Sequence, residues 1–277
     1  MPTPKIRPDL SGVPETMLWT LYNRASEARK INGYIRDPEA IRICDAIEYD
    51  YKRSFGLADG SHACRSAEID VVLKPWLADH PGGWVVALGE GLETQLSRVD
   101  NGTLTWLTVD LPEAMRFRER FLPARSRNPH FAGSALDRAW MDLVPAALPG
   151  SEVCIIAQGL FMYLPPDEVR RLMHDLAARF PGGWLIFDNV PRWLARLTLR
   201  PQGLMRTKHY RIPPMPWGID THEIAPLLRD WGVSTKTRTQ AYYQPHGVPW
   251  LVSSVMRLVP GWRERVPAIT RAVLQSC

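Results

Sequence analysis

The sequence predicts an α/β fold in which a mostly parallel, Rossmann-like sheet is covered by helices on both faces. Short apolar segments that suit buried strands recur at 84–88, 103–110, 129–134, 152–158 and 183–188. The stretches between them can each hold a crossover helix, and strands that alternate with helices are typical of a parallel sheet. At 277 residues, with 45% hydrophobic and 23% charged side chains, the chain is long enough to bury the core of such a domain.

Residues 1–80 precede the strands and predict an N-terminal helical cover. Apolar residues recur at helical spacing in 13–30 and in 37–55, where Asp37 before Pro38 predicts a helix cap with proline in the first turn. A third helix is predicted over 63–80, and it ends at a Pro-Gly-Gly turn that leads into the first strand.

The first strand ends in the turn Gly-Glu-Gly-Leu-Glu-Thr, which predicts a ligand site. Gly89 and Gly91 allow a tight turn and a close approach of the backbone to a ligand. In an open α/β sheet the ligand lies beyond the carboxyl ends of the strands, where this turn stands. Thr94 occupies the place of the third glycine of a dinucleotide fingerprint, so the glycines alone do not choose between nucleotide ligands.

Asp110 ends the second predicted strand, 21 residues after Gly89. An acid at this point accepts hydrogen bonds from ribose hydroxyls in enzymes that use NAD and in enzymes that use S-adenosylmethionine. The alternative role for Asp110 is to cap the helix that begins near Pro112. The two roles are compatible.

Two features after the third and fourth strands favour S-adenosylmethionine over NAD. Asp137 follows the third strand, where an acid or a backbone amide meets an adenine amino group, and 158–164 is an apolar and aromatic loop that suits a nucleoside. Taken singly, Leu160, Phe161 and Met162 also fit plain core positions. The next helix, 165–180, carries an apolar stripe that we expect to lie on the sheet.

We expect residues 191–250 to form an acceptor lid and the last core elements, with a helix near 221–231 and a polar strand at 233–241. A C-terminal helical tail is expected over 251–277. The helical cover over 1–80, a donor-binding core over 81–190, the lid and the tail are expected to form a single domain that spans 1–277.

The segment 192–211 is rich in arginine and aromatic residues. One hypothesis is that it closes over an anionic or aromatic acceptor, with Arg196 and Arg200 pairing or stacking with it. The alternative is a solvated basic helix.

Five segments, in this order and spacing, resemble the leucine carboxyl methyltransferase-like family, and especially its bacterial branch of polyketide O-methyltransferases of the tetracenomycin type. The resemblance is strong over 13–190 and weak beyond it. It implies a class I methyltransferase fold, S-adenosylmethionine as methyl donor and S-adenosylhomocysteine as product. The five segments are VVALGEGLETQLSRVD, VDLPEAMRFRERFLP, SALDRAWMD, AQGLFMYLPPDEVRRL and FPGGWLIFD.

The resemblance also implies a donor site. Arg65 holds the methionine carboxylate, with Arg24 as a second basic residue unless it is a solvated helix arginine; Asp110 binds the ribose, and Leu136 and Asp137 flank the adenine. The complete set expected at the donor is Arg24, Arg65, Gly89, Glu90, Gly91, Asp110, Leu111, Leu136, Asp137, Gln158 and Gly159.

Three departures from the family pattern stand out. Gln158 replaces a usual glutamate, and Glu90 and Glu93 stand where the family usually has an asparagine or alanine and an aspartate. The usual final apolar strand is missing from the C-terminal pattern, which puts the acceptor side in doubt.

The reaction expected is transfer of a methyl group to a hydroxyl or carboxylate of a small aromatic or polyketide-like metabolite, held collinear with the departing sulfur. A carboxylate needs no base, whereas a phenol profits from one. Tyr163 and His209 are the candidate catalytic residues; His222 and His246 are further candidates that no spacing distinguishes.

Composition limits the partners. The net charge of +5 comes without a run of like charges, so no nucleic acid is expected. The four cysteines form no CxxC pair, so neither a metal site nor a disulfide framework is predicted. No segment has the apolar length of a signal peptide core or a membrane span, which predicts a cytoplasmic protein with no membrane partner. The oligomeric state is left open between a monomer and a homodimer.

Other functions remain open at this stage. The family also contains protein carboxyl methyltransferases, and Gln158 keeps open a catalytically silent S-adenosylmethionine-binding protein. An NAD dehydrogenase is disfavoured by Thr94, and an RNA methyltransferase would need a basic, aromatic channel at which only 192–211 hints.

Overall fold

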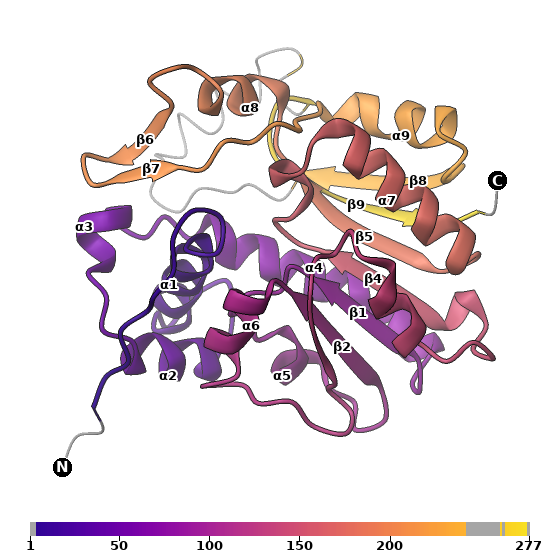
Figure 1. Cartoon of the computed structure of the whole chain (residues 1–277), viewed down its shortest axis with the longest axis horizontal. Helices are drawn as coiled ribbons and strands as arrows, with labels where there is room; N and C mark the ends of the chain where they lie inside the picture. Colours follow the sequence, from indigo (N-terminus) through magenta and orange to yellow (C-terminus); the bar gives the residue numbers. More distant parts are fainter. Residues whose placement is uncertain (1–3, 242–260, 262–263, 276–277) are drawn as a thin grey trace.

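A central sheet of seven strands dominates the computed structural model, which describes residues 4–241, 261 and 264–275 (Figure 1). The strand order is β3-β2-β1-β4-β5-β9-β8. Strands β1 to β5 pair in parallel, and β9 pairs antiparallel with both β5 and β8. The predicted Rossmann-like, mostly parallel sheet is therefore confirmed. The strands are β1 (Trp84–Leu88), β2 (Thr105–Asp110), β3 (His130–Ala132), β4 (Val153–Ala157), β5 (Trp184–Asn189), β8 (Lys236–Ala241) and β9 (Ala268–Val273).

Both faces of the sheet are buried by helices, as the alternation predicts. Successive side chains of β1 point to opposite faces, so Val86 and Leu88 pack with α7 (Pro166–Arg179) and α9 (Thr221–Asp230), whereas Val85 and Ala87 pack with α4 (Ser61–Asp79). In α7 the buried residues are Val169, Leu172, Met173, Leu176 and Ala177, the apolar stripe expected from its spacing.

The short helices α5 (Gln95–Val99) and α6 (Pro112–Arg118) follow β1 and β2. Two 3-10 helices precede β4 in the chain, η1 (Arg138–Leu143) and η2 (Gly150–Glu152), and one follows it, η3 (Phe161–Tyr163). None of the described helices is long and apolar enough to cross a membrane.

The helical cover is present, but the stretch 37–55 forms two helices, not one. Helix α1 (Thr16–Ala28) packs on α2 (Pro38–Ala46), and the α2 cap is confirmed because Asp37 accepts a hydrogen bond from the amide of Ala40 at 2.9 Å. Ile47 is extended and pairs with Ile6, which ends α2 before α3 (Tyr51–Phe55) begins.

The segment after β5 folds back over this cover. It contains α8 (Arg192–Thr198) and the hairpin of β6 (Leu204–Thr207) and β7 (Tyr210–Ile212), which lies beside α3 (Figure 1). Arg206 in β6 donates a hydrogen bond to the carbonyl of Phe55 in α3 at 2.9 Å. Within 192–211, for which a basic helix was one alternative, the helix spans only Arg192–Thr198.

The expected C-terminal helical tail is wrong for the described residues: 268–273 form strand β9, and the final strand thought to be missing is present. Apolar and polar residues alternate only weakly along β9, because the strand lies between β5 and β8 in a sheet that helices cover. Ala268, Ile269 and Thr270 are therefore all buried. The sheet is therefore completed by strands from outside 81–190. Residues 242–250 of the expected lid lie outside the described residues, as do 251–260 of the tail.

Candidate active site

A cavity of about 810 Å³ opens at the carboxyl ends of the parallel strands. Strand order reverses there between β1 and its neighbours β2 and β4, which is the usual position of a ligand in an open α/β sheet. Part of its lining comes from the loops after the strands and part from α1, α8 and the β6–β7 hairpin. The strand-end wall contains Gly89, Glu90, Gly91, Asp110, Leu111, Ser134, Ala135, Gln158, Gly159 and Asp188.

The glycine turn has the geometry that its sequence predicts. Gly89 and Gly91 have φ angles of 64° and 54°, in the left-handed region that glycine adopts without steric cost. A Cβ atom on Gly91 would lie 2.9 Å from Cβ of Met17, so the turn and helix α1 are in close contact. The buried guanidinium of Arg118 donates to the carbonyls of Gly91 and Glu93 at 2.7 and 2.8 Å and so holds the turn from behind.

Asp110 lies in the cavity wall and does not cap α6. Its carboxylate accepts hydrogen bonds from the backbone amides of Gly91 at 2.6 Å and Leu111 at 2.8 Å, and the N-cap of α6 is Leu111 without a side-chain bond. Burial raises the pKa of Asp110, and the two amides act against this rise. The contacts fix the carboxylate beside the glycine turn, where the ribose is predicted.

Arg65 reaches the cavity from α4 and meets the ends of β4 and β5. Its guanidinium pairs with the buried carboxylate of Asp188 at 3.0 Å, and Asp188 accepts from the amide of Gly159 at 2.5 Å. Gly159 has a φ of 68°, and a Cβ atom there would lie 3.0 Å from the Arg65 guanidinium. Glycine at 159 thus leaves room for Arg65, and both residues line the cavity.

Asp188 was missed by sequence reasoning, although the clue was available. It is an acid near the end of the predicted strand 183–188, as Asp110 is at the end of 103–110. It lines the cavity with 1% of its surface exposed.

Gln158 also lies in the cavity wall and keeps one polar atom without a partner. Its Nε2 donates to Oγ of Ser66 at 3.0 Å and to Glu93 at 3.2 Å, whereas its buried Oε1 has no hydrogen-bond partner in the described structure. A buried oxygen without a partner costs free energy unless a ligand donates to it. The ammonium group of a methionine moiety is a suitable donor, so glutamine fits a donor site here.

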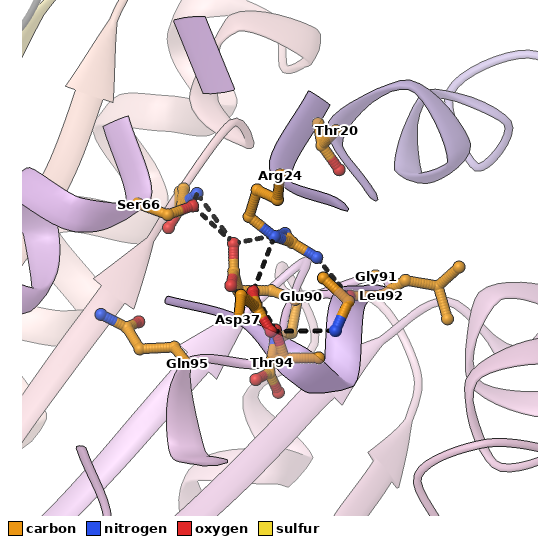
Figure 2. A network of polar contacts seen from close by, with 12 residues as sticks. Thr20, Arg24, Asp37, Ser66, Glu90, Gly91, Leu92, Thr94 and Gln95 are labelled. Atoms are coloured by element: carbon orange, nitrogen blue, oxygen red, sulfur yellow. Dashed lines mark hydrogen bonds and ion pairs between the residues drawn. The ribbon is translucent and has the colours of Figure 1, made fainter. Parts of the chain in front are cut away.

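Arg24 does not reach the cavity, and its expected contact with the methionine carboxylate is corrected. The side chain is 1% exposed and donates to Glu93 and to the carbonyl of Leu92, both at 2.6 Å. It points toward Asp37, 3.5 Å away, within the network of Figure 2. Arg24 therefore ties α1 to the glycine loop, since a buried guanidinium needs partners for its charge.

Glu93 is the centre of this network. It accepts from Arg24 and Ser66 on one oxygen and from Arg98 and the amide of Thr94 on the other, over 2.6 to 2.9 Å. Burial acts to raise the pKa of Glu93, but the guanidinium groups of Arg24 and Arg98 outweigh it and hold the pKa below its usual range. The carboxylate is therefore ionised at neutral pH.

Three other expected donor contacts also change. Glu90 contributes to the wall, but its carboxylate turns away to Thr108 at 2.6 Å and Arg118 at 3.2 Å. Leu136 packs against the core, and Asp137 caps η1 through the amide of Ala139 at 2.9 Å; neither belongs to the cavity wall as the structure describes it. The neighbouring Ser134 and Ala135 line the cavity instead.

Among the candidate catalytic residues in the described part of the chain, the structure places Tyr163 in the cavity wall and His209 and His222 outside it. Tyr163 lines the cavity, and burial raises its pKa to about 12. His209 is exposed in the β6–β7 turn, and His222 is exposed beside Glu264, so neither belongs to the described wall. His246 lies outside the described residues.

The lid contacts the cavity through residues other than the expected arginines. Arg196 and Arg200 are exposed and do not contribute to the wall. Trp193 and Leu194 from α8 and Arg206 from β6 do line the cavity. His62, from the first turn of α4, also lines the cavity, and no pattern in the sequence distinguished it.

These features fit S-adenosylmethionine: a glycine turn beside a fixed acid, an unpartnered oxygen on Gln158 and a guanidinium on Arg65. A cavity of about 810 Å³ lies in the upper part of the range for small-molecule sites, with room for a donor and an acceptor. Sheet and site together define a class I S-adenosylmethionine-dependent methyltransferase.

The chain belongs to the leucine carboxyl methyltransferase family, whose model matches residues 17–177. It is 29% identical over 201 residues to the tetracenomycin polyketide synthesis O-methyltransferase TcmP of Streptomyces glaucescens, a match that covers 72% of this chain and 73% of that enzyme. It is 26% identical over 190 residues to the S-adenosyl-L-methionine-dependent methyltransferase dpfgK of Gibberella zeae, covering 62% of each. The protein is thus an S-adenosylmethionine-dependent methyltransferase.

Solved structures share the fold. The carbon methyltransferase CurJ aligns with 95% of this chain and 68% of its own, at a TM-score of 0.50 and 12% identity. This similarity supports the class I sheet and does not extend to the substrate.

Proposed function

We propose that the protein transfers the methyl group of S-adenosylmethionine to an oxygen of a small, largely apolar and aromatic or polyketide-like molecule. The observation that carries the proposal is an apolar chamber in the same cavity as the donor turn. Its lining comes from α1, η3 and the lid and includes Met17, Trp19, Met162, Leu194, Leu204, Ile212 and Met215. Such a lining binds a ring system through burial of apolar surface.

The proposed acceptor oxygen is already ionised when it binds, as in a carboxylate or an acidic phenol. Burial raises the pKa of Tyr163 to about 12, so this phenol keeps its proton at neutral pH and donates hydrogen bonds. Burial and the charge of Arg65 lower the pKa of His62 to about 3, which makes it a weak proton acceptor. Neither residue suits the removal of a proton from a neutral hydroxyl.

The chain's own residues then position and enclose the reactants. S-adenosylmethionine supplies a sulfonium-bound methyl group, and its transfer to a carboxylate gives an ester and releases no proton. Asp110, Arg65 and Gln158 would hold the donor, and the apolar chamber would exclude water and align the acceptor. As further parts of the proposal, neither nucleic acid nor membrane takes part, and the protein is a cytoplasmic monomer or homodimer.

The test is a titration calorimetry experiment followed by an activity assay. We expect S-adenosylhomocysteine to bind with one site per chain and NAD not to bind. We then expect transfer of labelled methyl from S-adenosylmethionine to 1-hydroxy-2-naphthoate or 1-naphthoate, with less transfer to 1-naphthol. Binding without transfer to any of these, together with labelling of proteins in a cell extract, would replace this proposal with a protein carboxyl methyltransferase.

A further inference from the structure

His62 lines the cavity beside Trp19, over which Arg206 of the β6–β7 hairpin lies. It lies one helical turn before Arg65 on α4, and its ring meets the edge of Trp19 with 5.0 Å between centroids. Its Nδ1 atom lies 2.9 Å from Nδ2 of Asn23 in α1. Its Nε2 atom has no hydrogen-bond partner among the described residues, and the residue lines the cavity.

The contacts of Asn23 determine which nitrogen of His62 carries the proton. Oδ1 of Asn23 accepts from the backbone amides of Asp59 at 2.9 Å and Gly60 at 3.2 Å, and this orients the side-chain amide. The NH₂ group therefore faces His62, and an amide NH₂ only donates. Nδ1 of His62 must accept, so a neutral His62 carries its proton on Nε2.

The charges around His62 keep it neutral. Burial and the guanidinium groups of Arg65, Arg24 and Arg206 lower its pKa to about 3, while Asp59 acts to raise it. Asp59 is itself engaged by Ser61 and, at 3.1 Å, by Arg206. At neutral pH the cavity therefore meets a fixed N–H donor on an uncharged ring, in a positive surrounding.

We propose that His62 is an acceptor-binding residue that donates its Nε2–H to a lone-pair oxygen of the methyl acceptor. This deepens the proposed function and rests on it. The side chains beside the ring are Trp19 of α1 and Arg206 of β6, which both line the cavity, and Arg206 lies 5.0 Å above the ring of Trp19. Trp19 also belongs to the apolar lining proposed for the acceptor. A carboxylate or carbonyl oxygen satisfies this donor, whereas a group that only donates leaves it unpaired at a cost.

Two substitutions separate the two nitrogens of the ring. His62→Asn places its amide near the Nδ1 position, so it keeps the bond to Asn23 and loses the donor toward the cavity. His62→Gln places its amide near the Nε2 position, so it keeps that donor and loses the bond to Asn23. His209→Asn is the matched control, because His209 is exposed and outside the described cavity wall.

The measurement is binding of 1-naphthoate to the S-adenosylhomocysteine complex by tryptophan fluorescence, together with kcat and KM for 1-naphthoate methylation. We expect His62→Asn to weaken naphthoate binding by about 10-fold, as one lost charge-assisted hydrogen bond implies, and His62→Gln to weaken it less. The affinity for S-adenosylhomocysteine should be the same in both variants and in the control. The reverse order, in which His62→Gln is the weaker binder, would show that His62 acts only through Asn23.

A second readout does not depend on turnover. Nitrogen chemical shifts of His62 in the labelled protein should show the proton on Nε2 between pH 5 and 8 and should move when 1-naphthoate is added. A proton on Nδ1, or an imidazolium at pH 6, would overturn the inference even if methyl transfer is observed. If S-adenosylhomocysteine does not bind the wild type, the proposed function fails, while the chemical shifts still decide the tautomer. A loss of S-adenosylhomocysteine affinity in His62→Asn alone would move the contact to the donor.

Discussion

Replacement of Glu93 by glutamine tests the buried network that joins the helical cover to the glycine turn. Oε2 of Glu93 accepts from Arg24 at 2.6 Å, Ser66 at 2.7 Å and Gln158 at 3.2 Å. Oε1 accepts from Thr94 and Arg98, both at 2.9 Å. In either orientation the glutamine NH₂ would face donors, so hydrogen bonds are lost and donors oppose each other.

The magnitude follows from which partners keep other contacts. Arg98 retains Asp70 at 2.7 Å and Asp37 at 2.9 Å. Arg24 retains the carbonyl of Leu92 and a 3.5 Å contact with Asp37, and its Nε already lacks a hydrogen bond in the described structure. The charge of Arg24 is thus left poorly compensated, and breaking a buried pair of this kind costs about 3 to 5 kcal/mol of unfolding free energy.

Urea unfolding at pH 7 measures this loss. Glu39→Gln is the matched control, because Glu39 pairs with Arg42 on the surface of α2, where the loss should stay below about 1 kcal/mol. The depressed pKa of Glu93 means that its charge stabilises the fold at any pH above the ordinary glutamate range and that this stabilisation is lost as the pH falls below it. The gap between Glu93→Gln and wild type should therefore be constant from pH 7 to pH 5 and narrow in stronger acid. A loss below about 1 kcal/mol at pH 7 would refute the reasoning.

Three further predictions concern the cavity. Asp110→Asn should weaken S-adenosylhomocysteine binding by about 1 to 3 kcal/mol in calorimetry, since charge-assisted hydrogen bonds to the ribose are lost; unchanged affinity would remove the ribose role. Gly159→Ala should lower the free energy of unfolding by about 1 to 2 kcal/mol because the φ of Gly159 is 68°. It should also weaken S-adenosylhomocysteine binding, because the added Cβ displaces Arg65. Gly102→Ala, where φ is 84° and the surrounding space is open, should lower only the free energy of unfolding. His62 has a folded pKa of about 3, below the unfolded value of about 6.5, so between these values the unfolded state binds the extra proton. Wild-type stability should therefore decrease as the pH is lowered through this range, by at most about 1.4 kcal/mol per pH unit. His62→Gln should remove this part of the slope, and an unchanged slope would contradict a buried neutral imidazole.

The sequence determined the sheet and the glycine turn because both depend on local patterns. Strands β1, β2, β4 and β5 lie within a residue or two of the predicted apolar runs, since a strand buried on both faces is a continuous apolar run. Gly89 and Asp110 both line the cavity, because the carboxyl ends of parallel strands meet at the edge of the sheet where ligands bind.

The tertiary structure alone decided which of the other polar residues face the ligand. Arg24 and Arg65 are both arginines on helices of the cover, yet Arg24 is held by Glu93, far along the chain, while Arg65 reaches the cavity beside Asp188. His62 owes its tautomer to Asn23, which lies on another helix. Sequence spacing carries no information on such contacts, because a side chain's charge, burial and partners are set where distant segments pack. Strand β9 shows the same limit: both of its pairing partners, β5 and β8, come from other parts of the chain, so its own six residues do not identify it as a strand.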